Sequence, residues 1–148
     1  MQGQKRIFVI TTTSIYFLDQ KSLQIREHLY LNDLRCLSCS PYLDGVIVIH
    51  TNRKQVSKTG KKNKGDVLIS CEKLFEIITR LHIEYTLHTS NRIPIEILPH
   101  FTIDFADRQL DVNFQVANAP IASDSENEES TFSTEVMKNN NNITIVTQ

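Results

Sequence analysis

Short runs of apolar and β-branched residues, separated by polar turns, cover most of the first 116 residues of the chain. These runs occupy residues 6–12, 14–18, 25–31, 34–40, 45–50, 67–71, 94–98, 101–105 and 110–116. Their length and β-branched content predict strands, and the turn residues between them predict that neighbouring strands pair. Because the runs are short and closely spaced, we expect a meander that closes on itself.

One segment, residues 72–85, changes from the two-residue period of a strand to the period of a helix. Its apolar side chains are Leu74, Ile77, Ile78, Leu81 and Tyr85. Glu72 and Glu76 lie near its start, where the helix dipole favours acidic side chains. Such a stripe usually packs on the core, and a partner-binding face is the less common alternative. The chain is therefore expected to be mainly β with one capping α-helix.

The composition changes after residue 116. Residues 123–129 are acidic and lack apolar side chains, and residues 139–142 are all asparagine. Such stretches bury too little apolar surface to order themselves, so we expect a domain at residues 1–116 and a disordered acidic, asparagine-rich tail at residues 117–148. The charge divides at the same place. Residues 1–116 carry 15 basic and 12 acidic residues, whereas residues 117–148 carry one basic and five acidic residues.

Two serines in this tail are candidate phosphorylation sites. Ser123 and Ser125 each have an acid three residues further on, at Glu126 and Glu128, which is a spacing that acidophilic kinases prefer. Phosphate would add negative charge, and the tail could then fold back on a basic part of the chain and compete with an anionic ligand. The alternative is an inert tail.

The sequence offers little for catalysis or metal binding. Cys36, Cys39 and Cys71 are an odd number of cysteines without a secretion signal, which indicates reduced thiols. Cys36 and Cys39 are three apart on a predicted strand and so face opposite sides, which disfavours a metal site. No phosphate-binding glycine motif and no G-x-S-x-G motif occurs, and the five histidines are not clustered. We expect a protein that is not an enzyme and holds no cofactor.

The most unusual feature is a basic segment between residues 53 and 64. It holds six cations and no acid, namely Arg53, Lys54, Lys58, Lys61, Lys62 and Lys64. Like charges repel one another, so we expect a mobile loop that forms a positive patch and attracts anionic lipid, nucleic acid or an acidic partner. No aromatic residue lies among the cations, so no nucleic acid is expected as partner. A solvated loop without a ligand is the alternative.

A series of short segments from residue 5 to residue 116 is specific as an ordered set. The segments are RIFVIT at 6–11, IYFLDQKS at 15–22, LNDL at 31–34, LSCS at 37–40, KGD at 64–66, IEI at 95–97 and VNF at 112–114. Together they resemble the tail homology 1 domain of class I myosins. The resemblance implies a pleckstrin-homology-like fold, which is a bent β-sandwich or partial barrel closed at one end by a helix, with extra C-terminal strands.

The resemblance also implies a function and a site. Domains of this family bind phosphoinositides and other anionic lipids, and so link actin-based motors to membranes. Arg6 matches a basic residue that contacts the headgroup, and Lys5 adjoins it. The loops at residues 19–24 and 53–64 would open on the rim of the same lipid pocket. Lys21 and the six cations of the basic segment are added to the predicted site on charge.

Two departures from the family pattern bear on this expectation. The family's first strand should lie before Arg6, where five residues are available, so we expect that strand to be missing and an edge to be exposed. The motor and the calmodulin-binding neck are absent from the sequence as well, which suggests a partial gene product or a stand-alone tail-like protein.

The predicted function follows from these features together. No run of 18 apolar residues occurs, and we expect a cytoplasmic protein that lies peripherally on membranes or at the cell cortex. Its partners would be an anionic phospholipid surface and myosin or actin-cytoskeleton proteins. The alternative is a protein-interaction module that pairs through its exposed strand edge, or a fragment without lipid specificity.

Overall fold

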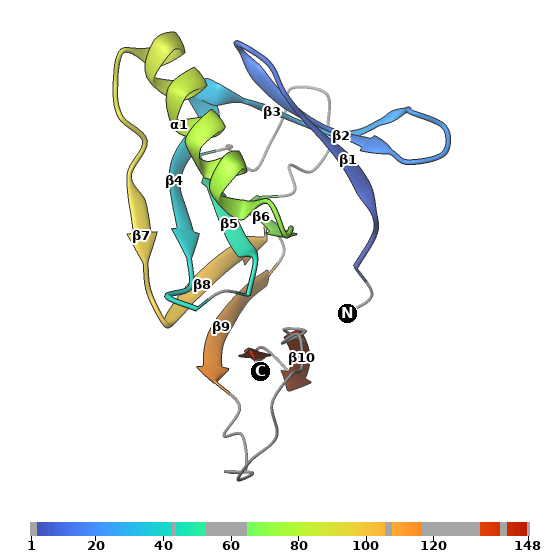
Figure 1. The fold of residues 1–148 in the computed structure, drawn as a ribbon, viewed down its shortest axis with the longest axis vertical. Helices are drawn as coiled ribbons and strands as arrows, with labels where there is room; N and C mark the ends of the chain where they lie inside the picture. Colours follow the sequence, from blue (N-terminus) through green and yellow to red (C-terminus); the bar gives the residue numbers. More distant parts are fainter. Residues whose placement is uncertain are drawn as a thin grey trace, which may run out of the picture.

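The computed structural model describes residues 3–42, 44–52, 65–105, 108–116, 134–139 and 142–147. Strands make up most of this described part, which also contains the 16-residue helix α1 (Leu74–Thr89) (Figure 1). This is the mainly β architecture with one helix that the sequence predicts.

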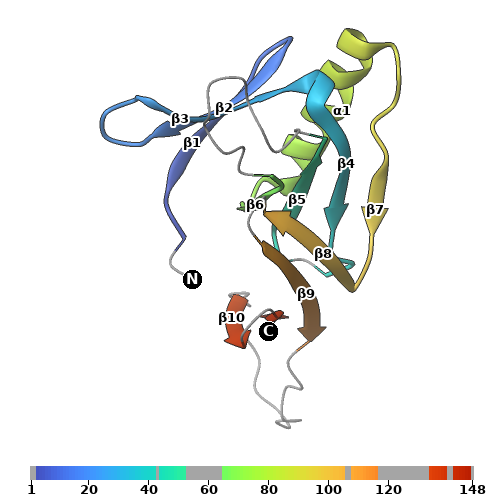
Figure 2. The same ribbon diagram turned by 180° about the vertical axis from the view of Figure 1, so that it is seen from behind.

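The first sheet is an antiparallel meander in the order β1-β2-β3. Its strands are β1 (Arg6–Ile10), β2 (Ser14–Asp19) and β3 (Ile25–Tyr30). Among the described residues β1 pairs with β2 alone, so the predicted exposed edge is present. The loop between β2 and β3 extends away from the rest of the molecule, to the right in Figure 1 and to the left in Figure 2.

The second sheet has the order β6-β5-β4-β7. Its strands are β4 (Leu34–Cys39), β5 (Val46–Thr51), β6 (Val67–Ser70) and β7 (Ile95–Ile97). The 3-10 helix η1 (Leu31–Asp33) leads the chain from β3 into β4. Gly45 precedes β5 with φ at 69°, and a Cβ there would lie 2.6 Å from the carbonyl oxygen of Cys71. This close approach and the left-handed backbone both require glycine.

The third sheet has the order β10-β11-β9-β8. Its strands are β8 (His100–Phe105), β9 (Arg108–Val116), β10 (Thr134–Asn139) and β11 (Asn142–Thr147). β11 pairs in parallel with β9, so the sheet includes two strands from the segment that the sequence assigns to the tail. The division of the chain at residue 116 remains a prediction.

Strand β5 is buried on both faces, which explains its uninterrupted apolar sequence. Ile47 and Ile49 belong to a core cluster that also holds Leu74 and Leu81 of α1. The alternate residues Val46 and Val48 belong to a second cluster, formed with side chains of β8 and β9. The middle sheet therefore lies between the helix and the β8–β9 hairpin, and the whole is the bent, pleckstrin-homology-like sandwich with a capping helix.

The helix is longer than the sequence predicts, because it continues four residues past Tyr85. The hydroxyls of Thr86 and Thr89 donate to the carbonyls of His82 and Tyr85, at 2.7 and 2.8 Å. Ser90, in the left-handed conformation with φ at 61°, ends the helix. The last turn of the helix packs little apolar surface on the core. Its sequence therefore lacks the helical spacing of apolar residues from which the rest of the helix is predicted. Within the described residues, no helix is long and apolar enough to cross a bilayer.

Candidate functional site

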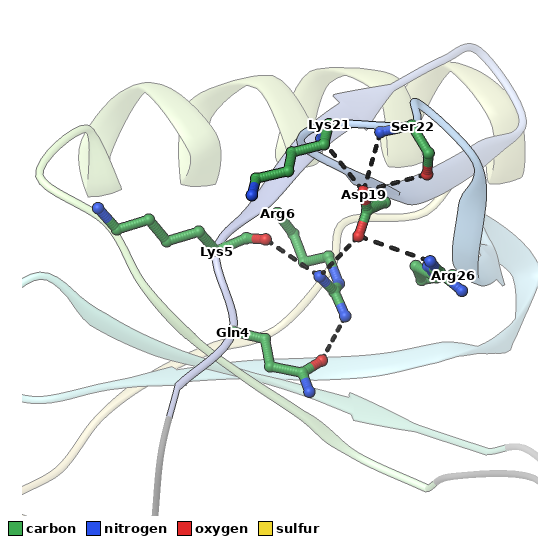
Figure 3. Close-up of polar contacts among 7 residues, drawn as sticks. All are labelled: Gln4, Lys5, Arg6, Asp19, Lys21, Ser22 and Arg26. Carbon is green, nitrogen blue, oxygen red and sulfur yellow. Dashed lines mark hydrogen bonds and ion pairs between the residues drawn. The ribbon is translucent and has the colours of Figure 1, made fainter.

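Asp19, at the end of β2, is the centre of a basic cluster (Figure 3). Its Oδ2 lies 3.5 Å from Nη1 of Arg6 and 3.6 Å from Nη2 of Arg26. Arg6 faces Asp19 because the two residues are partners in the β1–β2 register. Arg26 falls in a bulge of β3, where Phe17 pairs with Glu27 but Leu18 pairs with Ile25. Two guanidinium groups thus share one carboxylate oxygen.

The other oxygen of Asp19 holds the β2–β3 loop. Oδ1 accepts hydrogen bonds from the backbone N–H groups of Lys21 and Ser22 at 3.1 and 2.9 Å, and from the Ser22 hydroxyl at 3.0 Å. The bonds from Ser22 and from the Lys21 backbone, with the charge of Arg26, lower the pKa of Asp19 below its ordinary value. The carboxylate is therefore ionised at neutral pH, and both of its oxygens already have partners within the cluster.

Arg6 is also held from the N-terminal side. Its guanidinium donates to the carbonyl oxygen of Lys5 at 3.2 Å and to the side-chain oxygen of Gln4. In Figure 3 the side chains of Lys5 and Lys21 extend to the same side, and no dashed line reaches either amino group, because the drawn contacts of these two residues are made by their backbone atoms. The cluster of Lys5, Arg6, Lys21, Arg26 and Asp19, hereafter the basic cluster, carries four positive charges and one negative charge.

The basic cluster contains three of the nine lipid-binding residues that the sequence predicts, Lys5, Arg6 and Lys21. The other six lie outside the described residues, namely Arg53, Lys54, Lys58, Lys61, Lys62 and Lys64. The predicted phosphorylation sites Ser123 and Ser125 lie outside them too. Sequence reasoning missed Arg26, because only the bulge in β3 turns it toward Asp19, and a bulge is a property of strand pairing.

The two ends of the 53–64 segment are tied together at Asp66. Thr51 donates from its backbone N–H to Asp66 Oδ1 at 2.9 Å and from its hydroxyl to the Gly65 carbonyl at 3.0 Å. Asp66 Oδ2 lies 2.7 Å from Nδ1 of His50 and accepts from the backbone N–H of Asp104 at 3.0 Å. These contacts fix where the basic segment leaves and rejoins the sheet.

Asp66 stays charged although it is buried. Burial alone would raise the pKa of its carboxyl, but the hydrogen bonds from His50, Asp104 and Thr51 outweigh burial and lower this pKa. His50 Nε2 lies 2.8 Å from the Ser38 hydroxyl, so serine, histidine and aspartate follow one another as in a nucleophilic triad. Ser38 has no exposed surface, so no substrate reaches it. We interpret this series as a structural clamp.

A second surface feature lies on α1. A hollow of about 390 Å³ is lined by Phe75, Glu76, Thr79, Arg80 and Ile83. Its one basic side chain, Arg80, is paired with Glu84 at 2.9 Å. Of the predicted basic residues that the structure describes, Lys5, Arg6 and Lys21, none lines this hollow, and the basic cluster is the better match in charge for an anionic ligand.

The sequence pattern of a protein family described as "unconventional myosin tail, actin- and lipid-binding" matches residues 1–142. The chain belongs to this myosin tail homology 1 family. It is 33% identical over 117 residues to unconventional myosin-Ib of Mus musculus and of Homo sapiens, a match that covers 79% of the chain and 10% of each relative. It is 32% identical over 100 residues to unconventional myosin-Ia of Gallus gallus, covering 68% of the chain and 9% of that protein.

Family membership confirms the resemblance seen in the sequence. The match identifies a tail region, which is a binding module and not a motor. The chain spans about a tenth of the length of these relatives, so their activity as whole proteins is not transferred to it.

Proposed function

We propose that this chain is a peripheral membrane module that binds anionic phospholipid through the basic cluster and the basic segment at residues 53–64. The observation that carries the proposal is the convergence of Arg6 and Arg26 on Asp19 Oδ2, at 3.5 and 3.6 Å. The lipid-binding description of the family supports it. The resulting place of action is the membrane or cell cortex, beside the actin cytoskeleton.

The chemistry of the basic cluster suits a phosphate group. Guanidinium groups bind phosphate oxygens with charge-assisted, often bidentate hydrogen bonds. Asp19 opposes an incoming anion weakly, since one of its oxygens is covered by the loop donors and the other lies beside the two arginines. Near an anionic membrane each cation contributes about 1 kcal/mol, so the three net charges of the cluster supply about 3 kcal/mol. The six cations at residues 53–64 would add to this attraction.

Phosphoinositide preference is the finer part of the proposal. A phosphomonoester carries about −1.5 to −2 charges near neutral pH and presents three oxygens, so it suits two arginines better than a phosphodiester does. Arg6 is the residue that matches a headgroup ligand of the family. Arg26 would be a second headgroup ligand on the other side of Asp19.

Vesicle sedimentation tests the proposal. We expect binding to phosphatidylcholine vesicles to rise with added phosphatidylserine, to rise further with a phosphoinositide at matched total charge, and to weaken at high salt. Equal binding to neutral vesicles would contradict the function. Equal binding to serine lipid and phosphoinositide would contradict the headgroup preference alone.

A second candidate function is protein binding by strand addition, and the edge of β1 with which none of the described strands pairs favours it. Charge reversal separates the two functions. Replacing Lys58, Lys61, Lys62 and Lys64 by glutamate should abolish vesicle binding but leave pairing at β1 intact. Vesicle binding that survives this change would assign the membrane contact to the basic cluster alone. A wild-type chain that binds no anionic vesicles would favour the protein-binding function, with myosin or actin-cytoskeleton proteins as partners.

A further inference from the structure

The β2–β3 loop, residues 20–24, exposes apolar side chains next to the basic cluster. Leu23 in the loop is 61% exposed, and Ile25 at the start of β3 is 60% exposed. The loop extends from the body of the molecule in both views (Figures 1 and 2). Lys21 precedes Leu23 in the loop and Arg26 follows Ile25, so cations flank the apolar pair along the chain.

Leu23 is also unusual in its backbone. Its φ is 56°, in the left-handed region that glycine adopts freely and leucine adopts only against steric resistance. A leucine at this position has two energetic costs in water: its apolar side chain is exposed, and its backbone is strained. A glycine would remove both penalties, so the folding of the loop does not explain the leucine.

Several backbone N–H groups of the loop are hydrogen-bonded within the loop itself and do not need water as a partner. The N–H groups of Lys21 and Ser22 donate to Asp19 Oδ1, and the N–H of Leu23 donates to the Asp19 carbonyl at 2.9 Å. Asp19 in turn donates from its own N–H to the carbonyl of Gln24 at 2.9 Å. Three consecutive amide groups of the loop are therefore satisfied within the loop. Moving them out of water costs much less than moving unpaired amides.

We propose that Leu23 and Ile25 insert into the interface of an anionic bilayer while Arg6, Lys21 and Arg26 stay at the level of the headgroups. The inference rests on the proposed function and adds a hydrophobic anchor to it. The neighbouring cations indicate a bilayer as the partner. Apolar side chains surrounded by cations match the acyl chains of a bilayer beneath its anionic headgroups. Asp19 joins the two parts of the site, since it holds both the arginines and the loop.

The anchor and the cations respond differently to salt. Replacing Leu23 by serine should weaken vesicle binding about tenfold at both low and high salt, because burial of an apolar side chain is not screened. Replacing Lys21 by glutamine should weaken binding at low salt and have little effect at high salt. Leu87, which is 75% exposed on α1, supplies the matched control, and Leu87→Ser should leave binding unchanged.

Fluorescence tests insertion directly, because the chain contains no tryptophan. The full chain carrying Leu23→Trp is mixed with phosphatidylcholine vesicles that contain phosphatidylserine. We expect the emission to shift to the blue and to be quenched by lipids with brominated acyl chains. The same chain carrying Leu87→Trp should bind equally well and show neither change.

The outcomes separate the anchor from the proposed function. Binding of the Leu23→Trp protein without a blue shift, or an equal blue shift at Leu87→Trp, would overturn the insertion and leave lipid binding standing. A wild-type chain that does not bind these vesicles would overturn both. Leu23→Gly is a second test that relaxes the backbone. We expect its thermal midpoint to be equal or higher and its vesicle binding about tenfold weaker, and unchanged binding would overturn the insertion.

Discussion

Nδ1 of His50 lies 2.7 Å from Oδ2 of Asp66, and these two buried side chains join β5 to the segment that leads into β6. The pair spans the base of the basic segment at residues 53–64. Thr51 and Gly65, which flank the segment, are joined at the same place, so this contact holds the two ends of the segment together.

Asp66→Asn should destabilise the fold. The substitution removes the charged acceptor for His50, Thr51 and Asp104, and it places an amide donor where Oδ1 or Oδ2 accepted. We expect the free energy of unfolding in urea to fall by about 2–4 kcal/mol. Asp111→Asn is the control, because Asp111 is exposed and accepts one hydrogen bond from Thr102 at the surface. Equal losses in the two variants would contradict the clamp.

The same carboxylate predicts how stability depends on pH. The folded-state pKa of Asp66 lies below its ordinary value of 3.8, so the folded state favours the ionised form. Its contribution is fully present above the unfolded-state pKa and is lost as the pH falls through the lower folded-state pKa. Urea midpoints measured at decreasing pH below about 5 should fall for the wild type and fall less steeply for Asp66→Asn. A slope that Asp66→Asn leaves unchanged would assign the acid sensitivity to other groups.

Arg26→Glu tests the residue that the structure adds to the predicted site. The change reverses one charge in the basic cluster and removes one of the two guanidinium groups beside Asp19. Two units of charge at about 1 kcal/mol each predict a loss of about thirtyfold in affinity for anionic vesicles at low salt. Arg92→Glu makes the same charge change at an exposed position after α1, outside the basic cluster. If both variants lose affinity equally, net charge alone drives binding and the convergence on Asp19 has no role.

Phosphate on Ser123 and Ser125 should weaken vesicle binding if the acidic tail competes for the basic segment. The double substitution to glutamate is the informative variant, whereas removal of residues 117–148 would also remove β11, which pairs with β9. We expect a few-fold weaker binding at low salt and no difference at high salt. Unchanged binding at low salt would support the inert tail, and the double substitution to alanine controls for loss of the hydroxyls.

Gly45→Ala should destabilise the second sheet. The added Cβ would lie 2.6 Å from the Cys71 carbonyl oxygen at a backbone φ of 69°. We expect a loss of about 2 kcal/mol or more in the free energy of unfolding, since both the contact and the conformation oppose a side chain. Gly3→Ala is the matched control, because a Cβ there meets nothing within 4 Å. A loss of less than about 0.5 kcal/mol at residue 45 would show that the strands shift to make room.

The strands and the helix could be predicted because each is a local pattern that burial enforces. The sequence of β5 is an uninterrupted apolar run because both of its faces are buried. The sequence of α1 has apolar residues at helical spacing because one of its faces is buried. β10 and β11 were not predicted, because residues 143–146 form too short an apolar run and their pairing with β9 is parallel and distant in sequence.

The candidate site was predictable in part. Arg6 stands out by resemblance to the family and Lys21 by its charge, and both contact Asp19. The position of Arg26 beside Asp19 depends on a bulge in β3. The exposure of Leu23 depends on a left-handed backbone, which a leucine in the sequence does not predict. The clamp joins residues 16 apart on either side of the basic segment, so no local pattern reveals it. The predictions for residues 53–64 and for the two serines remain open to the experiments above.

The double burial of β5 determines how the domain can be divided. Ile15, Phe17 and Leu29 belong to the sheet that carries the basic cluster, and they share a core with Ile47 and Ile49. The next side chains along the same strand, Val46 and Val48, complete the other core with β8 and β9. A cut between the two cores would expose one face of β5 to water, so we expect the two clusters to unfold as one cooperative unit. The proposed lipid site would then be lost when either cluster unfolds.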